Sequence, residues 1–444
     1  MRGTLPAILL VLACCGAVPA RTPLPQRVAQ AAAREYTSGR TAGLEVAIVD
    51  AGRIVAAGGV GDATPSTTFS VGSVSKMFTA VSVMQLAERG KLHLDDRAAA
   101  YLPQFTVYDA VTIRELLDHT SGIPNYLDDA VNDGDVNSVT TPARILSSMV
   151  ARAPDFAPGT DWNYSNTGYV ALGQIVERIS GLPLAQYEQR FIFDPSGMRD
   201  TFVAPAFGKN VADSFGGTPG NWSWYYACGD VFSTAHDLAM FDVALMQGKI
   251  LGARSFAQMQ QTVPYTTLVP GMRDGLGLFL FQNGDLVEVG HHGGEPGYRA
   301  DNEMIPARGF AVAVVGNGAY ATQPIVNAAL QQYFPDQHVG MAPPPSAWVD
   351  GAPAMTKRIS ALLKDLAHGR ADRSQFEVLA SLSIEPMSEY LATTGSVQYV
   401  RFLNKTYTSS GILYEYQVGF PSGHATLGAL VERNGKYAKL FLVR

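Results

Sequence analysis

The order of strand-like and helix-like segments along the chain constrains its fold most strongly. Residues 43–50 and 54–61 have strand patterns on either side of the turn Ala51-Gly52-Arg53, which predicts a hairpin. Helical patterns fill the middle of the chain, and strand patterns return at residues 275–315 before a helical segment at 321–333. We expect the early hairpin and the late strands to share one antiparallel sheet, with the middle helices in a separate lobe. A cleft between two such parts is a natural binding site.

The first strong helical pattern covers residues 75–89. Its apolar residues recur with helical spacing, and Gly90 follows where a left-handed residue commonly ends a helix. We therefore predict an amphipathic helix here, with its apolar face against the core and its polar face outward.

The chain beyond residue 336 changes in composition. Residues 337–355 are rich in Pro, Gly and Ala, which predicts a semi-rigid linker. Residues 356–444 combine helical character with about four strand patterns, separated by turns such as Asn434-Gly435. We expect a small α+β domain here, after a first domain at residues 21–336. No motif in the small domain carries chemistry, so its role is unknown.

The N-terminus differs from a folded segment. Residues 1–20 combine a basic start at Arg2, a short apolar run and small residues up to Ala20, which is typical of a secretory signal peptide. The alternative is a buried N-terminal helix. A lipobox-like pattern before Cys14 would instead allow lipidation, which anchors a protein without spanning the membrane. We expect a secreted or periplasmic protein, or a membrane-anchored lipoprotein.

Cysteine usage and charge exclude further classes. Two of the three cysteines lie in the predicted signal peptide, so Cys228 stands alone and no internal disulfide can form in the mature chain. A lone cysteine between Ala227 and Gly229 is typical of a small buried residue. The net charge of -6 gives no support to nucleic-acid binding, which usually shows a basic surface, so we expect no nucleic-acid partner.

Three short motifs carry the candidate chemistry, and the first is Ser73-Val74-Ser75-Lys76. A spacing of three residues places the Ser73 hydroxyl and the Lys76 amine on one helical face. Serine needs a base to become a good nucleophile, and burial can lower the pKa of a lysine enough to serve. The helix N-terminus also offers N–H groups to an oxyanion. The alternative is a capping serine beside a solvated lysine.

The second motif is Tyr164-Ser165-Asn166, directly before a helical pattern at residues 167–180. A tyrosine near a cationic lysine can act as a base or as an acid. The amide of Asn166 can donate and accept hydrogen bonds, which suits a substrate amide. The alternative is a packed tyrosine followed by a helix cap.

The third motif is Gly290-His291-His292-Gly293-Gly294, between two strand patterns. Glycines here let a substrate backbone approach closely, and a backbone N–H on such a strand can form half of an oxyanion hole. Metal binding is the rival interpretation of adjacent histidines. The other histidines show no ligand spacing, so we predict no metal and no cofactor.

In this order and at these distances, the motifs resemble those of class C β-lactamases, D-Ala-D-Ala carboxypeptidases and related esterases. The resemblance covers about residues 27–333. It implies an α/β fold of the β-lactamase/transpeptidase-like kind: an antiparallel sheet flanked by helices, with an all-α lobe, here followed by the small C-terminal α+β domain. The segments that carry the resemblance beyond the motifs are residues 69–72, 90–96, 116–122, 195–198 and 233–238.

The same resemblance implies roles for single residues. Ser73 matches the acylated nucleophile, Lys76 the neighbouring lysine and Tyr164 the general base or acid. In this family the division of labour between the lysine and the tyrosine is disputed. The matching substrate-binding residues are Asn166, His291, Gly293 and Gly294, and the matching oxyanion donors are the N–H groups of Ser73 and Gly294.

One position departs from the class C pattern. Those enzymes carry lysine where this chain has His291, and histidine stands there in carboxypeptidase-like and esterase-like members. Loss of a fixed cation weakens capture of a substrate carboxylate, which argues against a dedicated β-lactamase. Arg299 follows this strand, and it either supplies a cation to the cleft or points to solvent.

We therefore predict an exported serine hydrolase that acts through a Ser73 acyl-enzyme on D-amino-acid peptides, esters or amides, with cell-wall peptides among the candidate substrates. A weak β-lactamase is the alternative within the same fold. The competing class is a non-catalytic protein that binds or senses cell-wall peptides, which would not need Ser73, Lys76 and Tyr164 together. The chain has no Gly-x-Ser-x-Gly elbow, which argues against an α/β-hydrolase.

Overall fold

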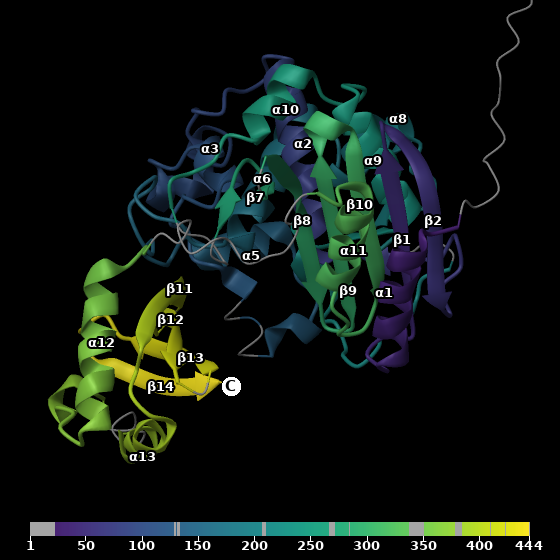
Figure 1. Cartoon of the computed structure of the whole chain (residues 1–444). Coiled ribbons are helices and arrows are strands. Elements are labelled where there is room, and N and C mark those ends of the chain that lie inside the picture. The colour runs from purple at the N-terminus through teal and green to yellow at the C-terminus, as the bar shows by residue number, and fades with distance from the viewer. Residues whose placement is uncertain are drawn as a thin grey trace, which may run out of the picture.

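The computed structural model divides into a larger body and a smaller C-terminal part, which follows α11 and is coloured yellow-green to yellow in Figure 1. The predicted signal peptide, with Cys14, and most of the predicted linker lie outside the described residues. The described residues are 23–127, 130, 134–206, 210–265, 271–283, 285–336, 350–377, 384–408, 410–421 and 423–443.

A seven-stranded antiparallel sheet forms the centre of the larger body. Its strand order is β2-β1-β10-β9-β8-β7-β6, so the N-terminal hairpin pairs directly with the late strands (Figure 1). This pairing confirms the shared sheet that the order of segments predicts. The strands are β1 (Gly43–Asp50), β2 (Arg53–Gly61), β6 (Met272–Asp274), β7 (Phe279–Asn283), β8 (Leu286–Glu295), β9 (Tyr298–Ile305) and β10 (Phe310–Asn317).

Helices cover both faces of this sheet. Successive side chains of a strand point to opposite faces, so β1 sends Val46 and Ile48 toward α1 (Gln26–Thr37) and α11 (Gln323–Tyr333). The intervening Ala47 joins the core on the other face, where α2 (Ser75–Glu88) and α9 (Ala235–Met246) lie. Both faces of the sheet are thus buried, which explains why β1 and β10 are almost continuously apolar.

The helix α2 differs from the amphipathic helix predicted for residues 75–89. Twelve of its 14 residues are buried, because the sheet packs on one side and the helical lobe on the other. The expected polar face is therefore wrong, and α2 is the central helix of the body. Its predicted end is confirmed, since Gly90 adopts a left-handed φ of 64° directly after it.

The helical lobe occupies the middle of the chain, as predicted. It packs around α2 and α6, and a small three-stranded sheet of order β3-β5-β4 lies beside it. The remaining helices and strands of the body are α3 (Ile113–Leu117), α5 (Pro142–Met149), α6 (Asn166–Ser180), α7 (Leu184–Glu188), α8 (Asp194–Ser196), α10 (Ala253–Met259), β3 (Phe69–Ser70), β4 (Phe202–Val203) and β5 (Val231–Ser233).

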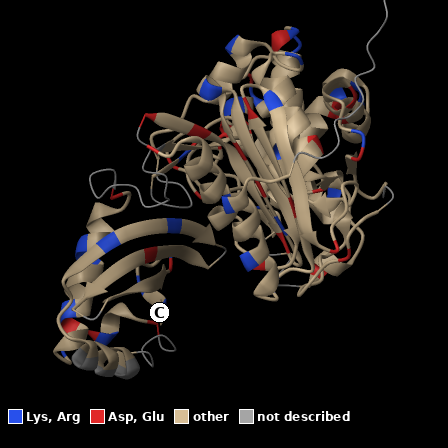
Figure 2. Ribbon diagram, turned by 45° about the vertical axis from the view of Figure 1, so that its right-hand side comes forward, with Lys and Arg blue, Asp and Glu red and all other residues tan. Residues whose placement is uncertain are grey.

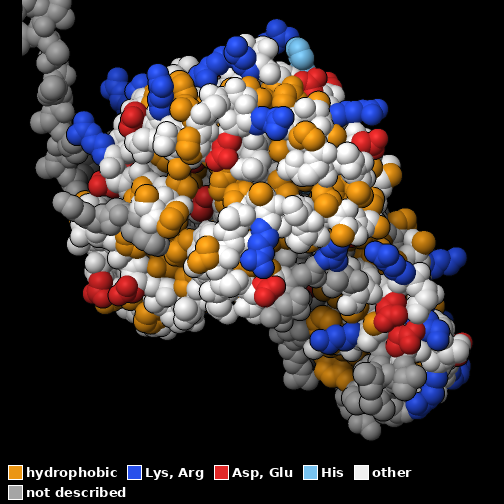
Figure 3. Space-filling model, turned by 180° about the vertical axis from the view of Figure 1, so that it is seen from behind, with side chains coloured by type: hydrophobic (Ala, Val, Ile, Leu, Met, Phe, Trp, Pro, Cys, Tyr) orange, Lys and Arg blue, Asp and Glu red, His pale blue; other side chains and the backbone are white. Residues whose placement is uncertain are grey.

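The C-terminal part has its own apolar core between a four-stranded antiparallel sheet and two helices. Seen from behind, it forms a smaller lobe at the edge of the body (Figure 3). None of the helices in the described ranges has the length and apolar character that crossing a bilayer requires. The elements of this part are α12 (Pro353–Ala367), α13 (Ile384–Thr394), β11 (Tyr399–Thr408), β12 (Gly411–Phe420), β13 (Gly423–Val431) and β14 (Tyr437–Val443).

Candidate active site

Ser73 lies in a short 3-10 turn, Gly72–Val74, that runs directly into α2. Gly72 adopts a left-handed φ of 50°, and a Cβ at this position would lie 2.7 Å from the nitrogen of Gly294. A Cβ at Gly293 would lie 1.8 Å from the carbonyl oxygen of Val71. Only glycines let the turn and β8 approach this closely, and the contact brings the backbone of Ser73 next to that of Gly294.

Lys76 is fully buried one residue into α2, and three segments of the chain converge on its amine. Its Nζ donates to Ser73 Oγ at 3.2 Å, to Asn166 Oδ1 at 2.7 Å and to the Cys228 carbonyl at 2.8 Å. Burial penalises the charged amine and lowers the pKa of Lys76 to about 8. A substantial fraction of Lys76 can therefore be neutral near pH 8 and accept a proton.

Tyr164 stands two residues before Asn166, and Ser165 between them caps α6 by accepting a hydrogen bond from the backbone of Gly168. The Tyr164 hydroxyl is fully enclosed, and Lys76 Nζ lies 4.8 Å from the centre of its ring. Burial raises the pKa of Tyr164 well above 10, although the nearby Ser73 hydroxyl opposes this. The phenol therefore stays protonated at neutral pH and is able to donate a proton.

His291 lies on β8 and turns its ring toward the same site. The centre of its ring is 6.3 Å from that of Tyr164, and its Nδ1 is 2.6 Å from the carbonyl oxygen of His292. A carbonyl only accepts hydrogen bonds, so Nδ1 carries the proton and Nε2 is left as an acceptor. Burial and the nearby Lys76 hold the pKa of His291 well below 6.5. His291 is thus a neutral imidazole at neutral pH.

Arg299 faces away from this site. On β9, Asn302 donates to Asp242 of α9 at 2.7 Å, so residues an odd number of positions away point to the opposite face of the sheet. The half-buried guanidinium of Arg299 donates to the carbonyl oxygens of Glu295 at 3.0 Å and Tyr298 at 2.8 Å. The expectation that Arg299 could supply a cation to the cleft is therefore wrong, because the partly exposed side chain lies on the other face and binds the carbonyls of its own turn.

Three buried titratable groups lie around Lys76, and the sequence motifs include none of them. Burial lowers the pKa of Lys76, and the nearby Cys228, Glu295 and Asp230 oppose this lowering whenever they are ionised. Burial in turn raises the pKa of Asp230 to about 7, of Glu295 to about 8 and of the Cys228 thiol to about 12. Cys228 is thus a buried, inert thiol, as its isolation in the sequence predicts. Only the fold brings these groups together, although Glu295 directly follows the third motif.

His119 is a further residue that motif analysis missed as part of the site. Its ring centre lies 4.4 Å from that of Tyr164, and its Nδ1 accepts a hydrogen bond from the Ser165 N–H at 3.2 Å. Burial holds the pKa of His119 well below 6.5, so it is a neutral acceptor. The signal was present in the sequence, because His119 belongs to the segment 116–122 that carries part of the family resemblance.

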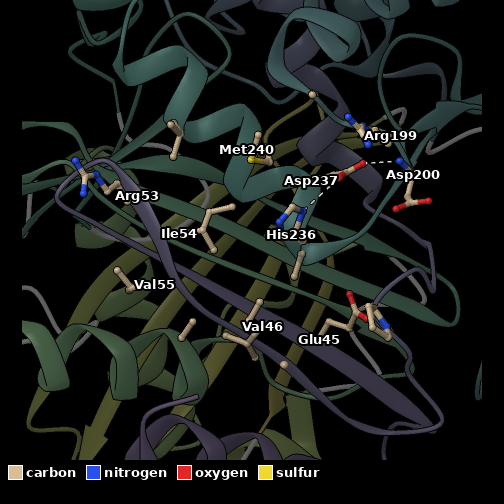
Figure 4. A pocket seen from close by; sticks show the side chains of 17 residues that line it. Glu45, Val46, Arg53, Ile54, Val55, Arg199, Asp200, His236, Asp237 and Met240 are labelled. Carbon is tan, nitrogen blue, oxygen red and sulfur yellow. Dashed lines mark hydrogen bonds and ion pairs between the residues drawn. The ribbon is translucent and has the colours of Figure 1, made fainter. Parts of the chain in front are cut away.

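A separate cavity of about 580 Å³ lies between β2 and α9 (Figure 4). Apolar side chains from both elements line it, and charged groups stand at its border. None of the motif residues lines it, so this cavity is distinct from the site around Ser73. Its lining includes Val46, Ile54, Met240, Arg53, Arg199 and His236.

The comparisons with known proteins agree with this geometry. The family model described as Beta-lactamase matches residues 26–333. Penicillin-binding protein PbpX of Bacillus subtilis is 30% identical over 252 residues, which are 54% of this chain and 59% of that protein. The chain spans 59% and 31% of the lengths of the first two curated relatives found.

Two solved structures have the same fold. A D-stereospecific amidohydrolase from Streptomyces sp. superposes with a TM-score of 0.63 at 28% identity, covering 69% of this chain and 98% of that one. An octameric penicillin-binding protein homologue from Pyrococcus abyssi superposes with a TM-score of 0.63 at 22% identity, covering 91% of this chain and 90% of that one. These structures confirm the predicted fold class, including the antiparallel sheet at the C-terminus.

Proposed function

Since this chain belongs to the Beta-lactamase family of serine hydrolases, we propose that Ser73 is its nucleophile and that its substrates are amides, esters or peptides of D-amino acids. One observation carries the proposal: the amine of Lys76 contacts Ser73 Oγ at 3.2 Å, and its pKa is about 8. An amine so placed can take the serine proton near neutral pH. A protein that only binds its ligand has no need of this arrangement.

The sequence left open how Lys76 and Tyr164 divide the proton transfers, and the directions of their pKa shifts favour one assignment. Neutral Lys76 takes the proton of Ser73 as Oγ attacks the substrate carbonyl carbon. The backbone N–H groups of Ser73 and Gly294 donate to the oxyanion that forms. Tyr164, which is protonated, then gives its proton to the leaving amine or alkoxide, and the Lys76 ammonium returns a proton to Tyr164 as the bond to the leaving group breaks.

Hydrolysis of the acyl-enzyme runs through the same groups. A water molecule gives one proton to neutral Lys76 and adds to the ester carbonyl. Collapse of the second tetrahedral intermediate breaks the bond to Ser73 Oγ, which recovers its proton from Lys76. The acid leaves, and the free enzyme is restored with its starting protonation.

The substrate class follows from the charges around the site. His291 is neutral and Arg299 lies on the other face of the sheet, so neither of these two residues supplies a cation to bind a substrate carboxylate. Because Oδ1 of Asn166 is held by Lys76 at 2.7 Å, its Nδ2 is the group left to donate to a substrate carbonyl. Amides and esters without a free carboxylate therefore suit the site better than D-Ala-D-Ala peptides. The similarity to a D-stereospecific amidohydrolase supports D-amino-acid derivatives.

A second candidate function is weak β-lactamase activity. Similarity to penicillin-binding protein PbpX favours recognition of β-lactams by the same serine. The neutral His291 again argues that turnover of these carboxylate-bearing compounds is slow.

Parallel turnover of four compounds tests this proposal. We expect a D-amino-acid p-nitroanilide to react faster than its L-enantiomer, a D-Ala-D-Ala peptide or nitrocefin. Ser73→Ala should lower kcat/KM by about 10³-fold or more, and a fluorophosphonate should label Ser73 in the native chain. Absence of any adduct on Ser73 from both the fluorophosphonate and a fluorescent penicillin would remove Ser73 as the nucleophile. Faster turnover of nitrocefin than of the D-amino-acid p-nitroanilide would contradict the preference for amides and would favour β-lactamase activity.

We also propose that the protein is exported, because residues 1–20 have the pattern of a signal peptide. Export would place cell-wall peptides among its possible substrates. Mass spectrometry of the N-terminus of the protein from its native host distinguishes the cases: a start after Ala20 supports secretion, a lipid on Cys14 supports anchoring, and an intact Met1 contradicts both.

A further inference from the structure

The reverse face of β8 and β9 carries a buried group of acidic side chains around His292. Neighbouring residues of a strand alternate in direction, so His292 points away from the site that His291 faces. In the antiparallel register His292 stands opposite Asp301, and Glu303 follows on the same side of β9. Figure 2 shows acidic residues in red on the strands of the large sheet. One imidazole and two carboxylates thus share a face that the reaction does not use.

The three side chains converge on a small volume. The Nδ1 of His292 lies 3.1 Å from Asp301 Oδ1 and 3.8 Å from Glu303 Oε1. One ligand atom from each residue lies within 4.8 Å of the other two. Ligands of a tetrahedral Zn²⁺ ion, at about 2.1 Å from the metal, are about 3.4 Å apart. Small side-chain adjustments would therefore bring all three atoms around one ion.

Two carboxylate oxygens in this cluster remain without a hydrogen bond. Asp301 Oδ2 and Glu303 Oε2 are fully buried, and neither accepts a hydrogen bond from the part of the chain that the structure describes. The side chains are 0% and 4% exposed, and buried acceptors are normally paired. Glu288 also lies close enough to act on the charge of Glu303. The cluster thus presents buried carboxylate oxygens that a bound cation could satisfy.

We propose that His292, Asp301 and Glu303 bind one divalent transition-metal ion, with Zn²⁺ as its class. A charge of +2 balances two carboxylates, and an imidazole nitrogen among the ligands favours a transition metal over Ca²⁺ or Mg²⁺. The His292 side chain is 35% exposed, which leaves a path for the ion and a place for a water as the fourth ligand. The spacing of histidines along the sequence misses this set, because its ligands come from two strands.

The ion would contact β8 on the sheet face opposite to the candidate active site. It would tie β8 to β9 immediately next to Gly293 and Gly294, the residues whose backbone packs against the turn that carries Ser73. We assign it a positioning role and no part in the bond-making steps. The proposal is independent of the hydrolase activity, and Ser73→Ala should bind the ion as the native chain does.

Titration calorimetry of the full, tag-free chain with ZnCl2, after treatment with a chelator, tests the site directly. We expect one Zn²⁺ per chain, and at least about a 10-fold loss of affinity in His292→Ala and in Asp301→Asn. The matched control is His236→Ala, since His236 lies 3.6 Å from Asp237 and stands in no three-ligand group of the described residues. CoCl2 should give the visible absorption of a tetrahedral site in the native chain and not in the two variants.

Three results would overturn the proposal. They are the absence of Zn²⁺ binding by the native chain at millimolar concentration, unchanged affinity in both variants, and binding of Ca²⁺ as tight as that of Zn²⁺. Should Asp301→Asn fail to fold by circular dichroism, Glu303→Gln takes its place in the comparison. In that variant Zn²⁺ should no longer raise the melting temperature, as it does in the native chain by stabilising the folded state.

Discussion

The larger body and the C-terminal part bury different kinds of side chains. The body encloses a long series of charged and polar groups, among them Lys76, Asp230 and Glu295 around the candidate nucleophile. In residues 350–377, 384–408, 410–421 and 423–443, Asn404 is the only buried residue of this kind. Burying charge costs stability unless it is compensated. Repeated burial of charged groups in the body therefore indicates a functional site. The C-terminal part instead has a core of mainly apolar and aromatic side chains.

The two parts meet close to the candidate site. The hydroxyl of Tyr407 on β11 donates to Asp161 Oδ2 at 2.6 Å, and the Lys405 amine contacts the same oxygen. The ring of Tyr407 also packs on Phe156, with 5.1 Å between the ring centres. Asp161 stands three residues before Tyr164, so the C-terminal part contacts the segment that leads to the proposed proton donor. The contrast between the two parts can therefore be tested by changing each part alone.

The largest effect is expected for Lys76→Ala in the body. Loss of the amine leaves Ser73 without a proton acceptor, so the rate of acylation should fall by about 10³-fold or more. Stopped-flow labelling with a fluorophosphonate measures this rate. The matched control is Lys91→Ala, which removes an exposed lysine just beyond α2 and should leave the rate unchanged. Labelling of Lys76→Ala at the native rate would contradict the role assigned to Lys76.

The pH dependence of the native enzyme also tests whether Lys76 accepts the proton. The pKa of Lys76 is lowered to about 8, and only the neutral amine accepts a proton. Below this pKa, kcat/KM should rise about tenfold per pH unit, and above it the rate should level off. A profile of kcat/KM from pH 6 to 9.5 measures this. A rate that falls over this range would mean that the protonated amine is the active form.

Truncating one buried side chain in each core tests whether stability and activity depend on different parts of the chain. Leu427→Ala in β13 and Leu172→Ala in α6 both remove a fully buried side chain, and each should lower the free energy of unfolding of its part by about 2–5 kcal/mol. Only Leu172→Ala should also lower kcat/KM, because α6 carries Asn166 and follows Tyr164. Urea unfolding and steady-state kinetics on both variants measure the two effects. Equal loss of activity would show that the C-terminal core supports the site.

The smallest effect is expected where the parts meet. Lys405→Ala removes a mostly enclosed ion pair with Asp161, worth about 0.5–1 kcal/mol. If the contact helps to hold the segment before Tyr164, kcat should fall by about 2–5-fold with little change in KM. The control is Lys439→Ala on β14, whose amine lies over Phe441 within the C-terminal part. An unchanged kcat would make the contact purely structural.

Much of the fold was predictable because hydrophobic periodicity reports local structure. The hairpin around Ala51-Gly52-Arg53, the shared sheet and the four C-terminal strands all follow from alternation and turn residues. The polar face expected for α2 was not correct. Its pattern shows where apolar residues recur, but it does not show that a second layer covers the other side of the helix.

The sequence by itself determined which side chains can share a local geometry. Ser73 and Lys76 lie together because three residues of helix place them on one face, and the glycines of the third motif permit close approach to β8. Tertiary structure decided how these groups behave. The pKa of Lys76, the neutral state of His291 and the cluster behind β8 depend on burial and on charges that distant segments bring near. Backbone spacing is a local property, whereas desolvation and charge proximity arise only when the chain has folded.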